Sequence, residues 1–494
     1  MQRGMIKKLS SDDYPTWVSD AVVYQIFPDR FRRSGRVNHQ RTLKLQPWES
    51  LPSDKGFQGG DLYGVIDALD YLKDLGVNCI YLNPIFLSSA NHRYHTSDYF
   101  QVDPILGGNE ALEELILKLH DRNMKIILDG VFNHCGRGFW AFNDLLENGN
   151  FSPYIDWFCI NKWPLIPYPK KNQNCGYQCW WNDPALPKFN HSNPSVCQYL
   201  LRVATHWLAK GIDGWRLDVP DEVPIDFWVE FRQTIKEINP EAWILGEIWD
   251  DASDWLKGDT FDGVMNYRVG WSSLCWSAGN KLSNSYLNPS YPIEKLSTKD
   301  YIDILNITFN SYSRNTNNSQ LNLLDSHDVP RALNTLMGDI NSLKIALLLL
   351  FLQPGAPCIY YGTEVGLSGG KEPKCREAFP LVDLANGDLK KYIRSLAKLR
   401  KRLEGLILGG FEWKLLEKDG ILGRLDHPEK SCFQYSSIQT LINRSKESWL
   451  KLPEKLDAPE LFRLGLVESD GKGVGPQSAV VFALPSRKIH NFDN

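Results

Sequence analysis

Acidic side chains follow four separate short apolar runs in this chain. Asp129 ends the run "MKIILD", Asp218 follows "GWRL", Glu247 follows "WILG", and Asp328 lies shortly after "LNLLD". Arg216 precedes Asp218 by two residues, so both side chains project from the same face of a predicted strand. Carboxylates gathered in one place repel each other and lose solvation, which costs stability unless a function needs them. We therefore interpret these acids as candidate catalytic residues.

Two histidines accompany the acids, His134 in "DGVFNH" and His327 in "LLDSHD". A lone carboxylate at a strand end is more often a cap or a turn former than a catalyst. A lone histidine is more often a hydrogen-bonded residue of the core. Acids at four different strand ends, with an arginine and two histidines among them, exceed what capping and packing explain. The set indicates a single site.

The elements that would position this site alternate between strand and helix patterns from residue 20 to about residue 405. Eight strand candidates begin at residues 21, 78, 124, 211, 242, 262, 321 and 356. One helix is predicted over residues 61–76, a second from Asn109 as its N-cap, and a third from Asn193 with Pro194 at its first position. Alternating strands and helices predict a parallel (β/α)8 barrel, an α/β fold whose active site lies at the carboxyl ends of the strands.

Two segments break this alternation. Residues 135–190 are long, rich in aromatic residues and loop-like, which is typical of a functional insertion. After about residue 407 the patterns are short strands with turns, as in "FEWKLLE" and "SAVVFAL". We therefore expect a barrel domain over residues 1–134 and 191–406, an inserted B domain over 135–190 after the third strand, and a C-terminal β-sandwich domain over 407–494.

Composition excludes several classes of protein. The 494 residues carry a formal net charge of only −4, and no basic run with interleaved aromatic residues predicts a nucleic-acid partner. The longest apolar run, residues 345–352, is too short to cross a membrane and predicts a buried helix. The 10 cysteines follow no disulfide framework, and no second pair joins Cys175 and Cys179 in a zinc site. A cytoplasmic protein is expected.

Four of the motifs resemble, in order and placement, the signature regions of the α-amylase superfamily, glycoside hydrolase family thirteen. These are "DGVFNH", "GWRLDVPDEV", "ILGEIWD" and "LLDSHD". "LPKFN" is similar to the fifth motif of its neopullulanase, cyclomaltodextrinase and maltogenic amylase group. "VVYQIFPDRF", "HRYHTSDYFQVDP" and "QPGAPCIYYGTEVG" are also similar to that group. The resemblance covers residues 15–405 and implies an α-glucan hydrolase that retains the anomeric configuration.

The resemblance implies a role for each acid. Asp218 would be the nucleophile, Glu247 the general acid and base, and Asp328 a third acid that binds sugar hydroxyls. The two carboxyls of a retaining glycosidase lie about 5–5.5 Å apart. Arg216 is expected to keep Asp218 ionised by lowering its pKa, whereas the surroundings of Glu247 are expected to raise its pKa.

The remaining site residues are assigned to substrate binding. His134 and His327 would bind hydroxyls of the sugar at the cleavage point, and Tyr94 would stack beneath its ring. "GGKEPKCR" resembles "GGxDPxxR" and places Glu372 and Arg376 on the next sugars. "VPDEV" stands where the group has "VANEV", so Glu222 matches while Pro220 and Asp221 depart. The complete substrate-binding set is Tyr94, Asp129, His134, Arg216, Glu222, His327, Glu372 and Arg376.

No cofactor or required metal is expected. The group often binds calcium through an Asn/Asp-rich stretch after "PDRF", which reads "RRSGRVNHQ" here, and only "GGD" at residues 59–61 remains of that pattern.

The expected reaction is hydrolysis of α-1,4 bonds, α-1,6 bonds or both in maltooligosaccharides, pullulan or branched glucans. One alternative is a 4-α-glucanotransferase that uses the same covalent intermediate, and another is an inactive carbohydrate-binding homologue. In the group, "YQIFPDRF" usually follows an extra β domain that pairs subunits and narrows the active site. Only residues 1–23 precede the motif here. We therefore expect a monomer with an open cleft, a preference for long or branched chains over cyclodextrins, and debranching activity like that of cyanobacterial enzymes without the domain.

Overall fold

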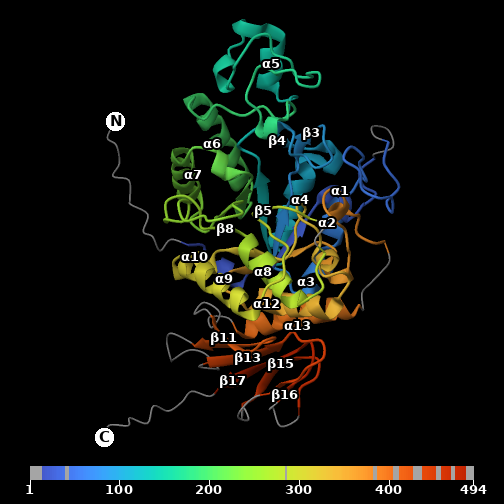
Figure 1. Cartoon of the computed structure of the whole chain (residues 1–494). Coiled ribbons are helices and arrows are strands. Elements are labelled where there is room, and N and C mark those ends of the chain that lie inside the picture. Colours follow the sequence, from blue (N-terminus) through green and yellow to red (C-terminus); the bar gives the residue numbers. More distant parts are fainter. Residues whose placement is uncertain are drawn as a thin grey trace.

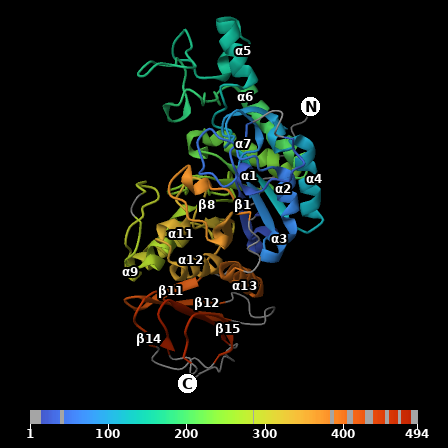
Figure 2. The ribbon, with the colours of Figure 1, turned by 90° about the vertical axis from the view of Figure 1, so that its right-hand side faces the viewer.

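The computed structural model describes residues 14–38, 44–283, 286–381, 387–403, 411–426, 437–451, 458–468 and 473–484. The expected boundary at residues 406 and 407 lies outside these residues. Figure 1 shows three layers along the long axis of the molecule, with the segment around α5 at one end, the barrel in the middle and an antiparallel sheet at the other end. Figure 2 shows the same order from the side.

Eight parallel strands close into a barrel, which confirms the predicted fold. Its strands are β1 (Val23–Ile26), β2 (Cys79–Leu82), β5 (Lys125–Gly130), β6 (Gly214–Leu217), β7 (Trp243–Gly246), β8 (Gly263–Asn266), β9 (Leu321–Leu323) and β10 (Ala356–Tyr360). The strands follow one another around the ring in chain order. Val23 of β1 pairs with Cys79 of β2 on one side and with Cys358 of β10 on the other, so the first and last strands complete the ring.

The alternation of side chains along each strand separates two apolar cores. Val23 and Ile127 point into the barrel, whereas Tyr24 and Ile126 pack against the surrounding helices. The same alternation places Trp215 and Leu217 among the helices. Arg216 between them therefore faces the inside of the barrel, as the sequence predicts.

Helices cover the outside of the barrel. They are α1 (Pro28–Phe31), α2 (Leu62–Asp67), α3 (Leu69–Leu75), α4 (Gly108–His120), α6 (Pro194–Ala209), α7 (Ile225–Ile238), α8 (Tyr267–Ala278), α9 (Thr298–Asn310), α10 (Arg314–Asn318), α11 (Ala332–Thr335), α12 (Ile340–Leu352) and α13 (Asp388–Arg402). Residues 345–352 of α12 are all buried, as predicted for the apolar run. In the described part of the chain, no helix combines the length and the apolar character needed to cross a membrane.

Two helix predictions are wrong in detail. Residues 61–76 form two helices instead of one, because the chain breaks at Ala68 (φ −97°, ψ −2°) before the second begins. Asn109 does not cap α4, which begins at Gly108 after Gly107 at φ 106°. The Asn109 side chain instead accepts a hydrogen bond from the backbone N–H of Val102. The Asn193 cap of α6 is confirmed, since its side chain accepts from the N–H of Ser195.

Residues 135–190 lie between β5 and α6 and contain α5 (Trp140–Asn148). Aromatic rings fill this inserted segment, where Phe142 packs edge-on against Phe158 and Tyr177. Isolated bridges join Ile160 to Tyr177 and Cys179 to Pro187, so residues 158–160, 177–179 and 187–189 run as a small ribbon. A further bridge pairs Lys188 with His134, which ties this ribbon to the end of the third barrel strand.

The other strands form small antiparallel sheets. The C-terminal sheet has the order β11 (Phe411–Glu417), β12 (Gly420–Asp426), β13 (Ser437–Asn443), β17 (Ser478–Leu484) and β15 (Glu460–Leu464). A second pair there joins β14 (Leu450–Lys451) and β16 (Gly473–Val474). Arg444 fixes these sheets to the barrel domain by donating to the carbonyl oxygens of Trp276 and Leu296, both at 2.9 Å. A hairpin of β3 (Phe86–Ser88) and β4 (Thr96–Val102) carries Tyr94 in its connection.

Candidate active site

Arg216 joins carboxyl groups from three neighbouring strands. Its Nη1 lies 2.7 Å from Asp129 Oδ1 and 2.9 Å from Asp218 Oδ1, and its Nη2 lies 2.7 Å from Glu247 Oε1. The barrel register explains this convergence, because Asp129 of β5 pairs directly with Arg216 of β6 and Glu247 follows β7, the next strand. The Arg216 side chain is fully buried, so its charge acts on the three acids without competition from solvent.

Asp129 lies beneath the site and does not line the cleft. Its Oδ1 is paired with Arg216, and its Oδ2 accepts hydrogen bonds from the hydroxyls of Tyr81 (2.8 Å) and Tyr94 (2.9 Å). All of its partners are protein groups, and its exposed fraction is 1%. The structure therefore places Asp129 and Arg216 beneath the cleft, where they contact Tyr94 and the acids above them, and their assignment to sugar binding stays a prediction.

His327 is held in one tautomer by its neighbours. Side-chain amides of Gln25 (3.0 Å) and Asn83 (3.2 Å) face its Nδ1, which therefore accepts, so the ring proton is on Nε2. Nε2 lies 2.5 Å from the Tyr94 hydroxyl and 3.1 Å from Asp328 Oδ2. Burial lowers the pKa of His327 well below its usual value and keeps the ring neutral. His327 thus connects the tyrosine to the third acid.

Asp328 lies where the loop after β9 enters the cleft, and its side chain is 25% exposed. Arg376 Nη2 lies 3.3 Å from Asp328 Oδ1, and Arg376 Nη1 lies 2.7 Å from Glu372 Oε1. Arg376 is itself fixed by a hydrogen bond from its Nε to the carbonyl oxygen of His327 at 2.9 Å. Glu372 therefore contacts Arg376, the arginine of the same predicted motif.

Burial, and after it the crowding of acids, raises the pKa values of Asp218, Glu247 and Asp328. Burial raises the pKa of Asp218 well above its usual range, and the charge of Arg216 only partly opposes that rise. The expectation of a lowered pKa counted Arg216 alone and is wrong for the net value. Burial also raises the pKa of Glu247, as expected for a proton donor. Burial and the charge of Glu247 raise the pKa of Asp328 to about 8. Because these groups interact strongly, their protons are shared across the cluster.

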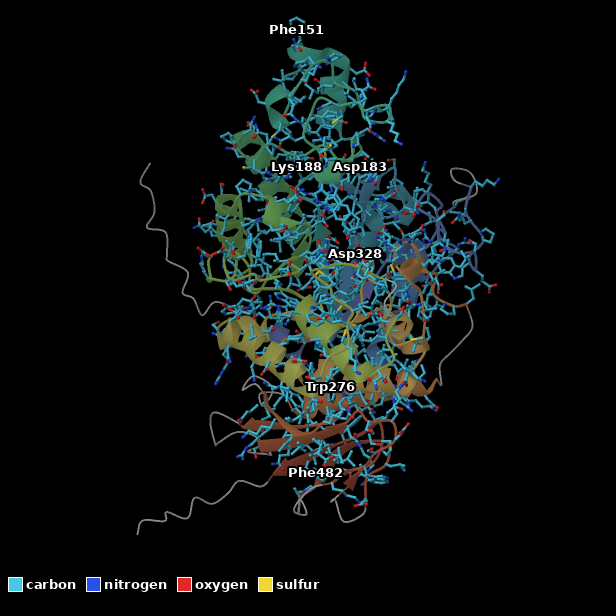
Figure 3. All side chains as sticks on the ribbon, in the orientation of Figure 1. Phe151, Asp183, Lys188, Trp276, Asp328 and Phe482 are labelled. Carbon is cyan, nitrogen blue, oxygen red and sulfur yellow. The ribbon has the colours of Figure 1, made fainter. Side chains whose placement is uncertain are left out.

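The three acids open into one cleft of ≈ 700 Å³. Figure 3 places Asp328 in the middle of the molecule, below Asp183 and Lys188 of the inserted segment. Eight of the predicted site residues line the cleft: Tyr94, His134, Asp218, Glu222, Glu247, Asp328, Glu372 and Arg376. Asp129, Arg216 and His327 lie directly beneath them. The cleft is also lined by residues that the sequence analysis did not select, among them His92, His95, Trp249 and Tyr286. His92 and His95 belong to the "HRYH" motif, and Trp249 belongs to "GEIWD". Both motifs are part of the family resemblance, so the resemblance could have identified these three residues.

One wall of the cleft is a stack of parallel rings. Trp180 lies on His134 with ring centroids 5.2 Å apart and planes at 14°, and Trp181 lies on Trp180 at 4.9 Å and 7°. Burial lowers the pKa of His134 to about 3, so its ring is neutral. No described protein group hydrogen-bonds to the buried Nε2 of His134, which leaves that atom for a hydroxyl of a bound sugar. Beside this wall, Lys188 Nζ and Glu222 Oε2 form an ion pair at 2.8 Å.

The described acids around the stretch that was compared with a calcium site, Asp29 and Asp61, do not fit such a site, and residues 39 and 40 of that stretch lie outside the described residues. Asp61 accepts from the N–H groups of Ser34 and Gly64, one with each carboxylate oxygen. Asp29 accepts from the N–H groups of Gln58 and Gly59 and pairs with Arg30. These acids are occupied by backbone donors and by an arginine, whereas calcium requires six to eight oxygen ligands. Among the described residues, no group of three or more metal-ligating side chains is present.

Comparison with known proteins shows which family and which solved structures this chain resembles. The family model described as "Alpha amylase, catalytic domain" matches residues 25–399. A cyclomaltodextrinase of Geobacillus thermopakistaniensis (strain MAS1) is 40% identical over 447 residues, which cover 90% of this chain and 72% of that protein. The solved debranching enzyme of Nostoc punctiforme has a TM-score of 0.84 at 39% identity and covers 95% of this chain and 99% of its own. Cyclic α-maltosyl-(1→6)-maltose hydrolase of Arthrobacter globiformis, solved with that sugar, has a TM-score of 0.83 at 34% identity, covering 95% and 100%.

Proposed function

We propose that this chain, which belongs to the α-amylase family and is an α-glucan hydrolase, acts on long and branched glucans with retention of the anomeric configuration. In this proposal, Asp218 is the nucleophile and Glu247 is the general acid and base. The observation that carries the proposal is the single buried guanidinium of Arg216 in contact with both carboxyls. It places them side by side at the ends of adjacent strands. A pair of carboxyls flanking the bond is what glycoside hydrolysis needs.

In the first step, Asp218 attacks the anomeric carbon while the proton of Glu247 passes to the glycosidic oxygen, and the bond to the leaving sugar breaks. In the second step, Glu247 takes a proton from water, whose oxygen attacks the anomeric carbon and releases Asp218. Arg216 donates a hydrogen bond to Asp218 at 2.9 Å and so favours its ionised form. Burial raises the pKa of Glu247, which favours the protonated form that a general acid needs.

The substrate-binding residues surround these two acids. Asp328, its carboxylate fixed by Arg376, would accept hydrogen bonds from hydroxyls of the distorted sugar. Tyr94 is held by Asp129 and His327 with its ring parallel to the histidine at 4°, which suits stacking beneath a sugar. His134 supplies its free Nε2 on the opposite wall. Glu372 and Arg376 would bind the sugars further from the cleaved bond.

Two observations support branched substrates. The debranching enzyme of Nostoc punctiforme shares the architecture over 95% of this chain and 99% of its own. The cleft, at ≈ 700 Å³, has space for several sugars, and Trp181 and Glu222 are among the residues that line it. A second candidate substrate is the cyclic sugar named for the Arthrobacter enzyme, which contains α-1,6 bonds as well. Transfer to a sugar acceptor instead of water remains the alternative reaction of the same intermediate.

The test compares kcat/KM on a branched maltooligosaccharide with long arms, maltooctaose, β-cyclodextrin and cyclic α-maltosyl-(1→6)-maltose. We expect the branched substrate to have the highest value and β-cyclodextrin the lowest. If β-cyclodextrin is the best substrate, the proposal of an open cleft for branched chains is wrong. Proton NMR of the first products is expected to show α-anomers, and β-anomers before mutarotation would contradict the two-step mechanism.

We further propose a monomeric, cytoplasmic enzyme that needs no metal. The cysteines of the described residues are all unpaired thiols, which suits a reducing compartment. Sedimentation as a tight dimer would contradict the monomer.

A further inference from the structure

Two cysteines of the inserted segment face each other beside the cleft. Cys175 Sγ and Cys179 Sγ are 3.9 Å apart, and a disulfide holds its sulfurs at about 2.05 Å. An approach of about 2 Å would therefore close the bond across a turn of three intervening residues. We propose that Cys175 and Cys179 are a dithiol modification site, which a disulfide oxidant such as oxidised glutathione converts to an intramolecular disulfide that weakens α-glucan binding.

The exposure of the two thiols sets the order of the reaction. Cys179 is half-buried and Cys175 is buried, so the oxidant meets Cys179 first. The Cys179 thiolate attacks one sulfur of oxidised glutathione, which forms a mixed disulfide and releases one glutathione. The Cys175 thiolate then attacks the Cys179 sulfur, forms the protein disulfide and releases the second glutathione. Two protons leave the protein thiols and two electrons pass to the oxidant, so atoms and charges balance.

The environment favours the disulfide over free thiolates once it has formed. Burial, followed by the neighbouring Cys175, raises the pKa of Cys179 to about 12. Strongly oxidising disulfides owe their potential to a stabilised thiolate in the reduced form. Cys179 has no such stabilisation, so oxidation is slow at neutral pH but its product resists reduction.

The ribbon of the inserted segment connects this pair to the active site. Cys179 is bridged to Pro187, and the N–H of Trp180 donates to the carbonyl oxygen of Leu186 at 3.0 Å. The Trp180 ring, one residue from Cys179, lies flat on His134. Closing the disulfide therefore pulls on the residue that forms the wall opposite the acids. A displacement of about 1 Å in a positioning residue can cost up to about 100-fold in rate.

Mass spectrometry of the full chain provides the direct test. Trypsin cleavage after Lys171 and Lys188 releases residues 172–188, which contain Cys175 and Cys179 and no other cysteine. After incubation with oxidised glutathione, we expect this peptide to resist alkylation and to weigh about 2 Da less than its reduced form. We expect kcat/KM on maltooctaose to fall about fivefold or more in the same sample and to recover with dithiothreitol.

Variants separate this pair from the other thiols. Cys175→Ser and Cys179→Ser are each expected to keep basal activity and to lose the response to oxidant. Cys159→Ser changes a half-buried cysteine of the same ribbon and is the matched control, which should still respond. The proposal is overturned if both cysteines stay open to alkylation, if the disulfide forms without changing kcat/KM, or if Cys179→Ser still responds. The peptide mass does not depend on which glucan is the substrate, so this failure is distinguishable from a wrong substrate assignment.

Discussion

Two buried clusters of charge lie at opposite ends of the barrel strands and differ in their balance. Near the amino ends of β7 and β8, the carboxylate of Asp262 is paired with Arg232 at 2.7 Å and Lys236 at 3.0 Å and accepts from the N–H of Ile244. One acid there has two cations. At the carboxyl ends, four acids (Asp129, Asp218, Glu247 and Asp328) share Arg216 and Arg376.

The difference separates a structural cluster from a catalytic one. Removing the single acid from the Asp262 cluster leaves two buried cations uncompensated, and that is strongly destabilising. Removing an acid from the crowded cluster relieves repulsion, so the fold gains while the chemistry is lost. Burial, and after it the neighbouring carboxylates, raises the pKa values of Asp218 and Asp328, which is a cost that catalysis explains and packing does not. The comparison thus predicts opposite effects of similar substitutions at the two ends.

The largest expected effect is on turnover. Asp218→Asn and Glu247→Gln should each reduce kcat by about 10⁴-fold or more, because they act as one unit of a covalent mechanism. Asp328→Asn should also reduce kcat by several orders of magnitude. Thermal unfolding should show a melting temperature equal to or above that of the wild type. If Asp218→Asn keeps more than about a tenth of the wild-type kcat, the assignment of Asp218 as the nucleophile is wrong.

The next effect is on stability at the other end of the barrel. Asp262→Asn should lower the free energy of unfolding by about 3–5 kcal/mol, because it leaves Arg232 and Lys236 buried without their counter-charge. The folded variant should keep its kcat below the melting temperature. As a control, changing Asp262, Arg232 and Lys236 together to apolar residues should restore much of the loss. If Asp262→Asn has the same free energy of unfolding as the wild type, the proposed difference between the two clusters is wrong.

A smaller effect concerns pH. The pKa of Asp328 is raised to about 8, so the folded protein binds this proton more tightly than the unfolded chain does. The stability that the proton supplies is present at low pH and is lost as pH rises toward about 8. Asp328→Asn has no such proton, so its advantage in melting temperature over the wild type should grow between pH 5 and pH 8, about the interval between the two pKa values. A constant difference across that range would show that the Asp328 pKa is not raised.

The smallest expected effect is that of a chelator. Asp29 and Asp61 already use their carboxylate oxygens on backbone donors, so removing divalent cations should leave kcat/KM and the melting temperature unchanged. Activity measured before and after dialysis against EDTA provides the check. Loss of activity that calcium restores would mean that the bound ion uses ligands other than these acids.

The barrel and its acids were predictable because they depend on local patterns. Alternating burial fixes the face of Arg216, and strands that run in chain order around a ring bring their carboxyl ends together. The contact between Arg216 and Glu247 was not predictable, since it depends on the reach of one side chain across two strands. The same holds for Asp129, whose burial beneath Tyr94 places it outside the lining of the cleft.

Other differences arise from tertiary contacts that override local signals. Asn109 has the chemistry of a helix cap, but the N–H of Val102 on the neighbouring strand takes its side-chain oxygen. The net pKa of Asp218 depends on burial, which no sequence pattern measures. His95 lines the cleft because the β3–β4 hairpin folds over it, and that placement appears only in three dimensions.

The closure of the ring between β1 and β10 has a consequence for folding during synthesis of the chain. Val23 pairs with Cys358, so the first strand keeps one unpaired edge until the last strand has been synthesised. A ribosome adds about 5–20 residues per second, so this interval lasts on the order of half a minute. An open strand edge is a template for pairing with another chain. The enzyme therefore acquires its activity and its protection from self-association at the same moment, when the eighth strand joins the first.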